Sequence, residues 1–292
     1  MSTAEVNTKF QLLPGADVPR APVFIVTLYG DAIEPRGGTL WMGDLVTCCA
    51  RQGISESLVR TAVSRLVTAG KLFGERIGRK SFYRLTGQAR AEFRQAARVL
   101  YAPPPPARGW LVAARAAEAL PEGWASLGQG AAIAPNREDI AFPAGPLLSA
   151  ETVGDPAGWP ALAADYWDLQ GVADRYKRFL LRFEALGALL KSGNGTVDLE
   201  GEEALALRLQ LVHHYRLAAL KDPRLPRDAW PSDWPAEEAR QLFVRAYLSL
   251  TAEADAFIGL TFRDAIGLLP SATEETCLRL DRLEREKAML TC

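Results

Sequence analysis

Four consecutive prolines at residues 103–106 constrain the fold of this 292-residue chain more than any other feature. Proline has a fixed φ and no backbone N–H, so such a run continues neither a helix nor the interior of a sheet. The run predicts a stiff, extended spacer after an N-terminal domain. Before it, residues 21–100 hold 12 Lys/Arg and 6 Asp/Glu, whereas residues 101–292 hold 20 and 27. A basic module joined to an acidic remainder indicates that only the first part meets a polyanion.

The segment before the prolines has the element order of a winged helix-turn-helix. Ser55 is placed to cap a helix through its hydroxyl, and Gly70 to end it in the left-handed conformation. Thr86 is placed to cap the last helix of the segment. In order, the predicted elements are a buried helix after Pro22, a short strand at 39–42, a helix between Asp44 and Gly53, a helix over 56–69, two strands over 72–85 around a tight turn at 77–80, and a helix to about residue 101.

The helix over 56–69 has two contrasting sides. Helical spacing predicts one apolar stripe that comprises Leu58, Val59, Ala62, Val63, Leu66 and Val67. The other side is small, polar and cationic, and it contains no acidic residue after Glu56. Small hydroxyl residues let a helix enter a ~12 Å major groove, and arginines can bind guanine edges or phosphates. An ordinary amphipathic helix with a solvated face is the alternative.

The hairpin that follows adds a second basic feature. Its turn is Gly78-Arg79-Lys80, with Arg76 just before it, so the tip can reach the sugar-phosphate backbone or the minor groove. An exposed basic turn without a partner is the alternative. Together the helix and the hairpin favour DNA binding, and the predicted DNA contacts are Ser57, Arg60, Thr61, Ser64, Arg65, Thr68, Arg76, Arg79 and Lys80.

The rest of the chain predicts an α+β protein that is mostly helical. The predicted domains are a flexible arm at 1–20, the winged helix-turn-helix at 21–102, a small α+β unit at 107–160 and a helical C-terminal domain at 161–292. No apolar stretch approaches the ~20 residues of a membrane span, and the N-terminus lacks a signal-peptide pattern. The spacing of the four cysteines suits neither zinc nor a disulfide framework. We therefore expect a cytoplasmic protein.

Several runs of this sequence resemble one known family. They are LYGDAIEPRGGTLWMGDLV, GISESLVRTAVSRLVTAGKL and GRKSFYRLTGQAR in the first third, and WDLQGVADRYKRFL, LVHHYR and LKDPRLPRDAWPSDWP further on. Through these runs, which extend over about two-thirds of its length, the chain resembles the PaaX family. The members of this family are repressors of phenylacetic-acid catabolism, and phenylacetyl-CoA releases them from DNA. The resemblance implies a winged-helix head, a ferredoxin-like middle domain, a helical C-terminal domain and a homodimer on a palindromic operator.

The resemblance also implies a site for an acyl-CoA effector, with no other cofactor. Such a ligand needs cations for its phosphates and aromatic or apolar walls. His213 and Arg216 lie three residues apart on one helical face and match the H-x-x-R run of the family. The candidate ligand residues are Trp167, Arg175, Arg178, His213 and Arg216. Aromatic residues at helical spacing are more often core, and a histidine near an apolar face is more often structural.

Two further functions stay open from the sequence. One is a metal-dependent nuclease, with Glu138 or Asp139 as an acid of the middle domain. The other is an adaptor whose winged helix binds protein. No Gly-rich phosphate loop or G-x-S-x-G motif is present, and His213 and His214 are adjacent and point apart on a helix. We therefore expect no metal site and no enzyme.

Overall fold

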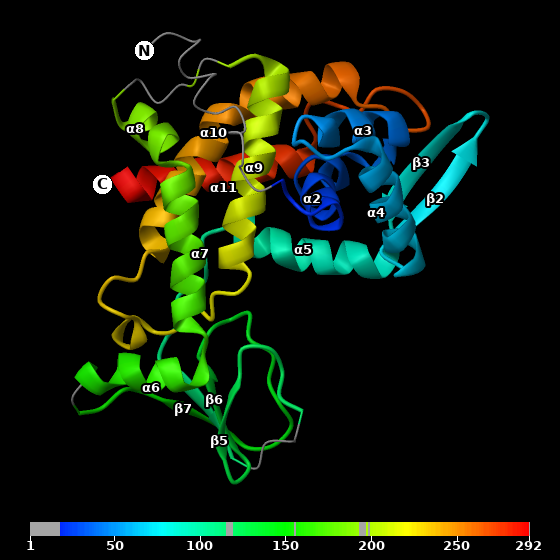
Figure 1. Cartoon of the computed structure of the whole chain (residues 1–292). Helices are drawn as coiled ribbons and strands as arrows, with labels where there is room; N and C mark the ends of the chain where they lie inside the picture. The colour runs from blue at the N-terminus through cyan, green and yellow to red at the C-terminus, as the bar shows by residue number, and fades with distance from the viewer. Residues whose placement is uncertain (1–17, 115–118, 155, 193–196, 198, 292) are drawn as a thin grey trace. The chain divides into compact units, whose positions relative to one another are not determined.

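The computed structural model describes residues 18–114, 119–154, 156–192, 197 and 199–291, and it divides into two compact units. Unit 1 comprises Met1–Ala102, Phe179–Arg216 and Arg240–Cys292; unit 2 comprises Pro103–Arg178 and Leu217–Ala239. Most of the predicted arm at 1–20 lies outside the described residues. The fold is α+β and mostly helical, as predicted (Figure 1).

The N-terminal part of unit 1 has the predicted order of a winged helix-turn-helix. The first helix is longer than its α-helical part, because a π-helical turn and a 3-10 turn continue it. The elements are α2 (Ala21–Leu28), the π turn Tyr29–Ile33, the 3-10 turn Glu34–Arg36, β1 (Thr39–Trp41), α3 (Met42–Ala50), α4 (Glu56–Thr68), β2 (Leu72–Ile77), β3 (Lys80–Leu85) and α5 (Gly87–Tyr101). The strands pair antiparallel in the order β1-β3-β2.

Three residues were predicted to mark helix boundaries in this part of the chain. Two of them do so as expected, and the third does not. Gly70 follows α4 with φ of +66°, a conformation that glycine adopts without a Cβ penalty. The Thr86 hydroxyl accepts a hydrogen bond from the backbone N of Ala89 and caps α5. The predicted hydroxyl cap at Ser55 is wrong: its side chain makes no capping bond, and its Oγ lies 3.1 Å from Ser57 Oγ. The Ser57 hydroxyl therefore takes the place of the backbone N–H groups as the hydrogen-bond partner of the Ser55 side chain.

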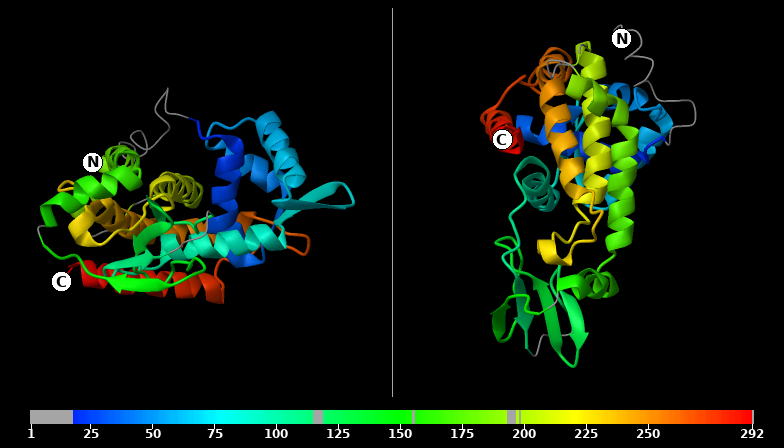
Figure 2. Two further views of the ribbon diagram at one scale, coloured as in Figure 1. Left: turned by 90° about the horizontal axis from the view of Figure 1, so that it is seen from below. Right: turned by 90° about the vertical axis from the view of Figure 1, so that its left-hand side faces the viewer.

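The β2–β3 hairpin projects from the N-terminal part of unit 1, and α4 packs beside β2 (Figures 1 and 2). Ile77 pairs with Lys80, so Gly78 and Arg79 form the two-residue turn. Gly78 has φ of +61°, which suits the turn geometry of a tight hairpin. The hairpin therefore carries its basic tip away from the core of its unit.

The remaining helices of unit 1 surround a buried set of charged side chains. They are α8 (Glu184–Ser192), α11 (Glu274–Thr291) and the parts of α7 (Leu169–Arg182), α9 (Gly201–Ala219) and α10 (Ala236–Thr261) that belong to this unit. Asp31 of the π turn accepts hydrogen bonds from Tyr101, Tyr247, Arg208 and Arg279. This carboxylate joins the first helix to α5, α9, α10 and α11.

Unit 2 is built on a four-stranded antiparallel sheet. Its strands are β4 (Trp110–Ala113), β5 (Ala125–Gly128), β6 (Ala131–Pro135) and β7 (Leu147–Ala150), in the order β5-β6-β4-β7. One face packs Trp110 against α6 (Trp159–Tyr166) and the start of α7, and the other packs Leu111 against Trp124 and Ile140. Trp110 and Trp159 stack with ring centroids 5.3 Å apart.

The strand order of unit 2 is that of a ferredoxin-like sheet, in which the first and third strands are central. Within the described residues, no helix joins β4 to β5 or β6 to β7, where a ferredoxin-like unit has its two crossovers. The units also do not follow the predicted ranges 107–160 and 161–292, because α7, α9 and α10 each contribute to both units. No helix in the described part of the chain is long and apolar enough to cross a membrane.

Candidate nucleic-acid interface

The polar side of α4 is open to solvent. All six predicted contact residues on this helix are exposed: Ser57, Arg60, Thr61, Ser64, Arg65 and Thr68. The hydroxyls of Thr61 and Thr68 donate to the backbone carbonyls of Ser57 and Ser64, four residues earlier. These bonds hold the hydroxyl groups close to the helix, so this face stays narrow.

The two arginines of α4 differ in their surroundings. Arg60 forms an ion pair with Glu56, with Nη2 2.7 Å from Oε1. Arg65 has no ion-pair or hydrogen-bond partner among the described residues and is fully available to a ligand. Glu56 is the single acidic residue of α4, so it lowers the net charge of the first turn and leaves the positive charge around Arg65 uncompensated.

The predicted apolar stripe of α4 is partly wrong. Val59, Ala62 and Val63 are buried, but Leu58 and Val67 are 55% and 40% exposed. At 3.6 residues per turn, Leu58 and Val67 lie at the two edges of the stripe, about 90° from its centre. They therefore border the polar face and add apolar surface beside it.

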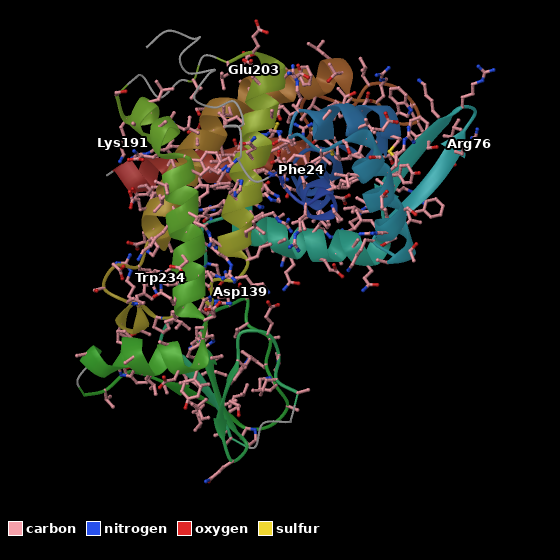
Figure 3. The ribbon with its side chains drawn as sticks, viewed as in Figure 1. Phe24, Arg76, Asp139, Lys191, Glu203 and Trp234 are labelled. Carbon is pink, nitrogen blue, oxygen red and sulfur yellow. The ribbon has the colours of Figure 1, made fainter. Side chains whose placement is uncertain are left out.

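The hairpin tip holds the remaining predicted contacts. Arg76 Nε donates to the carbonyl of Gly78 at 3.2 Å, and Figure 3 shows Arg76 on the hairpin. Arg79 is exposed at the turn and has no partner among the described residues. Lys80 Nζ lies 5.0 Å from the ring centroid of Trp41, a cation–π contact between β3 and β1.

The structure adds a basic residue that the sequence did not reveal. Arg263, just after α10, stacks on the same ring of Trp41 at 4.6 Å. Its carbonyl accepts from the Trp41 backbone N at 2.9 Å, and its guanidinium pairs with Asp44 of α3 at 2.8 Å. Lys80 and Arg263 therefore share one indole although they are far apart in the sequence. No local pattern marks this contact, because it depends only on tertiary packing.

The predicted ligand residues of α9 lie against α2. His213 is buried, and its Nδ1 is 3.1 Å from the hydroxyl of Thr27. Arg216 Nη1 lies 3.3 Å from the same hydroxyl and 3.3 Å from the carbonyl of Val23. The Thr27 hydroxyl also lies 3.2 Å from that carbonyl and accepts from Arg216, and the direction of its hydrogen bond with His213 follows the histidine tautomer. Both predicted residues thus contact the N-terminal helix of the unit.

Burial keeps both histidines of α9 neutral. Burial, together with the positive charges of Arg216 and Arg182, lowers the pKa of His213 to about 4. Burial, Arg182 and His213 lower the pKa of His214 to about 3. A neutral imidazole contributes no charge toward an anion near neutral pH, so Arg216 is the cation of this pair.

The other three predicted ligand residues belong to unit 2. Trp167 is half-buried and packs against Trp110, with ring centroids 5.9 Å apart. Arg175 lies 3.6 Å from Asp168, and Arg178 is exposed. The five candidates are therefore divided between the units, and neither unit contains them all.

The acids considered for a nuclease are engaged by arginines. Asp139 pairs with Arg137 at 2.8 Å and with Arg224 at 2.6 Å, and Glu138 lies 3.8 Å from Arg108. Among the described residues no cluster of three or more His, Cys, Asp or Glu side chains is arranged to hold a metal. The nuclease alternative is not favoured.

Comparisons with known proteins show which family this chain is similar to. Residues 20–89 match the family model of PaaX-like protein, and residues 167–259 match that of PaaX-like protein C-terminal domain. A solved structure of an uncharacterized protein from Mycobacterium tuberculosis has a TM-score of 0.45 and 20% identity, covering 82% of this chain and 99% of that one. Over 279 residues, and 85% of both chains, this chain is 31% identical to the transcriptional repressor PaaX of Escherichia coli (strain K12). An identity of this extent shows that the chain belongs to the PaaX family.

Proposed function

We propose that this chain is a DNA-binding transcriptional repressor that places α4 in the major groove of an operator. The observation that carries the proposal is the exposed face of α4, which has small hydroxyl side chains and two arginines next to a basic hairpin. The relative from Escherichia coli bears the name of a transcriptional repressor.

In this proposal α4 and the hairpin have different tasks. Arg65 reaches a base edge, because its guanidinium has no partner among the described residues and can bind guanine bidentately. Arg60 first exchanges its pair with Glu56 for a phosphate or base. Arg79 and Lys80, at the hairpin tip, bind phosphates beside the groove and fix the position of α4 without reading sequence.

The finer parts of the proposal come from the family resemblance. We propose a homodimer that binds a palindromic operator, because two recognition helices one helical turn apart match a two-fold symmetric site. We also propose that the repressed genes belong to phenylacetate-type aromatic-acid catabolism and that an aryl-CoA thioester releases the protein. Release requires that the thioester bind more tightly to the arrangement of the protein that does not bind DNA than to the arrangement that does.

The first experiment selects duplexes from a randomised library and measures their affinity by fluorescence anisotropy at several salt concentrations. We expect a sequence preference in the wild type, and Arg65→Ala lowers affinity for the selected duplex by ~1–3 kcal/mol and relaxes specificity at one base pair. Arg98→Ala is the matched control, because Arg98 is an exposed arginine on α5 outside α4 and the hairpin. Wild-type affinity in Arg65→Ala would refute the role of α4.

The second experiment adds phenylacetyl-CoA to the complex with the selected duplex, with free CoA as the control. The thioester is expected to raise the melting temperature of the free protein and to weaken the complex, since binding and release are thermodynamically linked. An unchanged duplex affinity at saturating thioester would remove the effector from the proposal and leave DNA binding in place.

A further inference from the structure

A cavity of about 310 Å³ lies in the N-terminal part of unit 1, between α2, α4, the β2–β3 hairpin and α5. This volume is at the lower end of the range of small-molecule sites, ~300–1,000 Å³. Its walls are mainly apolar, and the apolar side chains that carry the argument are Val23, Val26, Leu66, Leu72, Leu85 and Phe93. The polar side chains at its surface include Lys71, Glu92 and Arg216.

Arg216 is the one cation of this cavity without an acidic partner in the described part of the chain. Lys71 is already paired with Glu92 at 2.7 Å. Among the described residues, Arg216 donates hydrogen bonds only to neutral groups, the Val23 carbonyl and the Thr27 hydroxyl, both through Nη1. Its Nε and Nη2 atoms have no hydrogen-bond partner among the described residues, so they remain available to a ligand.

The buried arginines in the described part of unit 1 differ from the half-buried Arg216, because each is paired with a carboxylate. The pairs are Arg36–Asp255, Arg208–Asp31, Arg240–Glu286 and Arg279–Asp31. Burial lowers the pKa of Arg216, which means that its charged form is poorly solvated where it lies. A partly desolvated guanidinium without an anion favours the binding of one.

We infer that this cavity binds a small monocarboxylic acid with an aromatic or branched apolar body, whose carboxylate pairs with Arg216. The apolar walls take the body of the ligand, and the free edge of the guanidinium takes its two oxygens. The volume is enough for such an acid and too small to enclose a whole CoA thioester, so we treat this site as separate from that of the acyl-CoA effector proposed above.

The location of the cavity gives its occupant a regulatory role. Leu66 belongs to α4, and Leu72 and Leu85 are at the base of the hairpin, so a bound acid contacts both proposed DNA-binding elements. It therefore biases their arrangement if it fits one arrangement better than another. This regulatory consequence rests on the proposed function; the binding site itself does not.

Isothermal titration calorimetry of the full chain with 3-phenylpropionate tests the site, and the neutral 3-phenylpropanamide is the matched control ligand. We expect the acid to bind at least about tenfold more tightly than the amide, since only the acid pairs with the guanidinium. Arg216→Met abolishes this preference, whereas Arg98→Met on the exposed side of α5 keeps it. Equal binding of acid and amide by the wild type would overturn the role of Arg216.

Val26→Trp provides a second variant that leaves Arg216 in place and fills the cavity from α2. We expect it to reduce binding of both ligands by more than tenfold, and this test holds even if Arg216→Met fails to fold. Undiminished binding in Val26→Trp, or no heat from the acid with the wild type, would overturn the cavity as the site. If the acid binds but the duplex library yields no preferred sequence, the proposed function is refuted and the acid site is retained.

Discussion

Replacing Asp31 with asparagine tests the buried network that joins the first helix to the rest of unit 1. Asp31 is 1% exposed, and its carboxylate accepts from the hydroxyls of Tyr101 and Tyr247, both at 2.9 Å. Arg208 Nε lies 3.0 Å from it and Arg279 Nη1 3.5 Å. Asparagine has nearly the same shape but no charge, and its amide nitrogen donates where the carboxylate has a second acceptor oxygen, so the variant removes the anion and one acceptor.

The size of the expected loss in stability depends on which hydrogen-bond and ion-pair partners each arginine retains in the variant. Arg208 also pairs with Asp255 at 2.6 Å, so it retains an anion in the variant. Arg279 has no other carboxylate among the described residues and keeps two backbone carbonyls, the Tyr247 hydroxyl and the ring of Tyr101. Removing one partner of a buried pair costs ~3–5 kcal/mol. Because only one arginine loses its anion, we expect Asp31→Asn to lower the free energy of unfolding by about 3 kcal/mol.

The pH dependence gives an independent check. Burial alone would raise the pKa of Asp31, but Arg208, Arg279 and the two tyrosine hydroxyls outweigh it and hold the pKa below its usual value of 3.8. A lowered pKa means that the carboxylate stabilises the fold fully above the unfolded pKa and loses this contribution as pH falls through the folded one. The difference between wild type and Asp31→Asn should therefore shrink below pH 4.

Urea unfolding followed by far-UV circular dichroism measures both effects. Glu284→Gln is the control, because Glu284 is 58% exposed and Lys287 is its one ion-pair partner among the described residues, so its change should stay within ~0.5 kcal/mol. A loss in Asp31→Asn as small as that of the control would refute the argument that this network holds unit 1 together.

Three other predictions follow from particular residues. Alanine at Arg79 or Lys80 should weaken binding to all duplexes alike, as measured by fluorescence anisotropy. It should also reduce the slope of log affinity against log salt concentration by ~1 per lost phosphate contact. A loss of affinity for particular sequences only would assign these residues to base readout. Because the pKa of folded His213 is about 4, below its unfolded value of 6.5, its contribution is complete above pH 6.5 and is lost as pH falls toward 4. This amounts to on the order of 2 kcal/mol between pH 7 and pH 5 in urea unfolding. His213→Gln should remove this share of the slope, while His214, whose pKa burial lowers to about 3, keeps its own share. The Trp110 side chain is 2% exposed, so Trp110→Ala should lower the stability of unit 2 by ~3–5 kcal/mol. Hydrogen exchange in β4, β6 and β7 should become faster, and unchanged exchange there would show that the sheet does not depend on this ring.

Local sequence signals determined most of the N-terminal part of unit 1. The glycine after α4, the threonine before α5 and the four prolines act on their own neighbours through φ and through single hydrogen bonds. Such signals need no tertiary information, so the order of helices and strands there was predicted correctly. The exposed polar face of α4 was likewise visible as a periodic pattern, although its DNA contacts stay a prediction.

Tertiary structure alone decided how distant segments combine. The sequence did not reveal that Asp31 meets Arg208 and Arg279, or that Arg263 stacks on the ring of Trp41. It also did not show that α7, α9 and α10 serve both units. These contacts join residues far apart in the chain, and a periodic pattern marks which face of a helix is buried without naming the element that covers it.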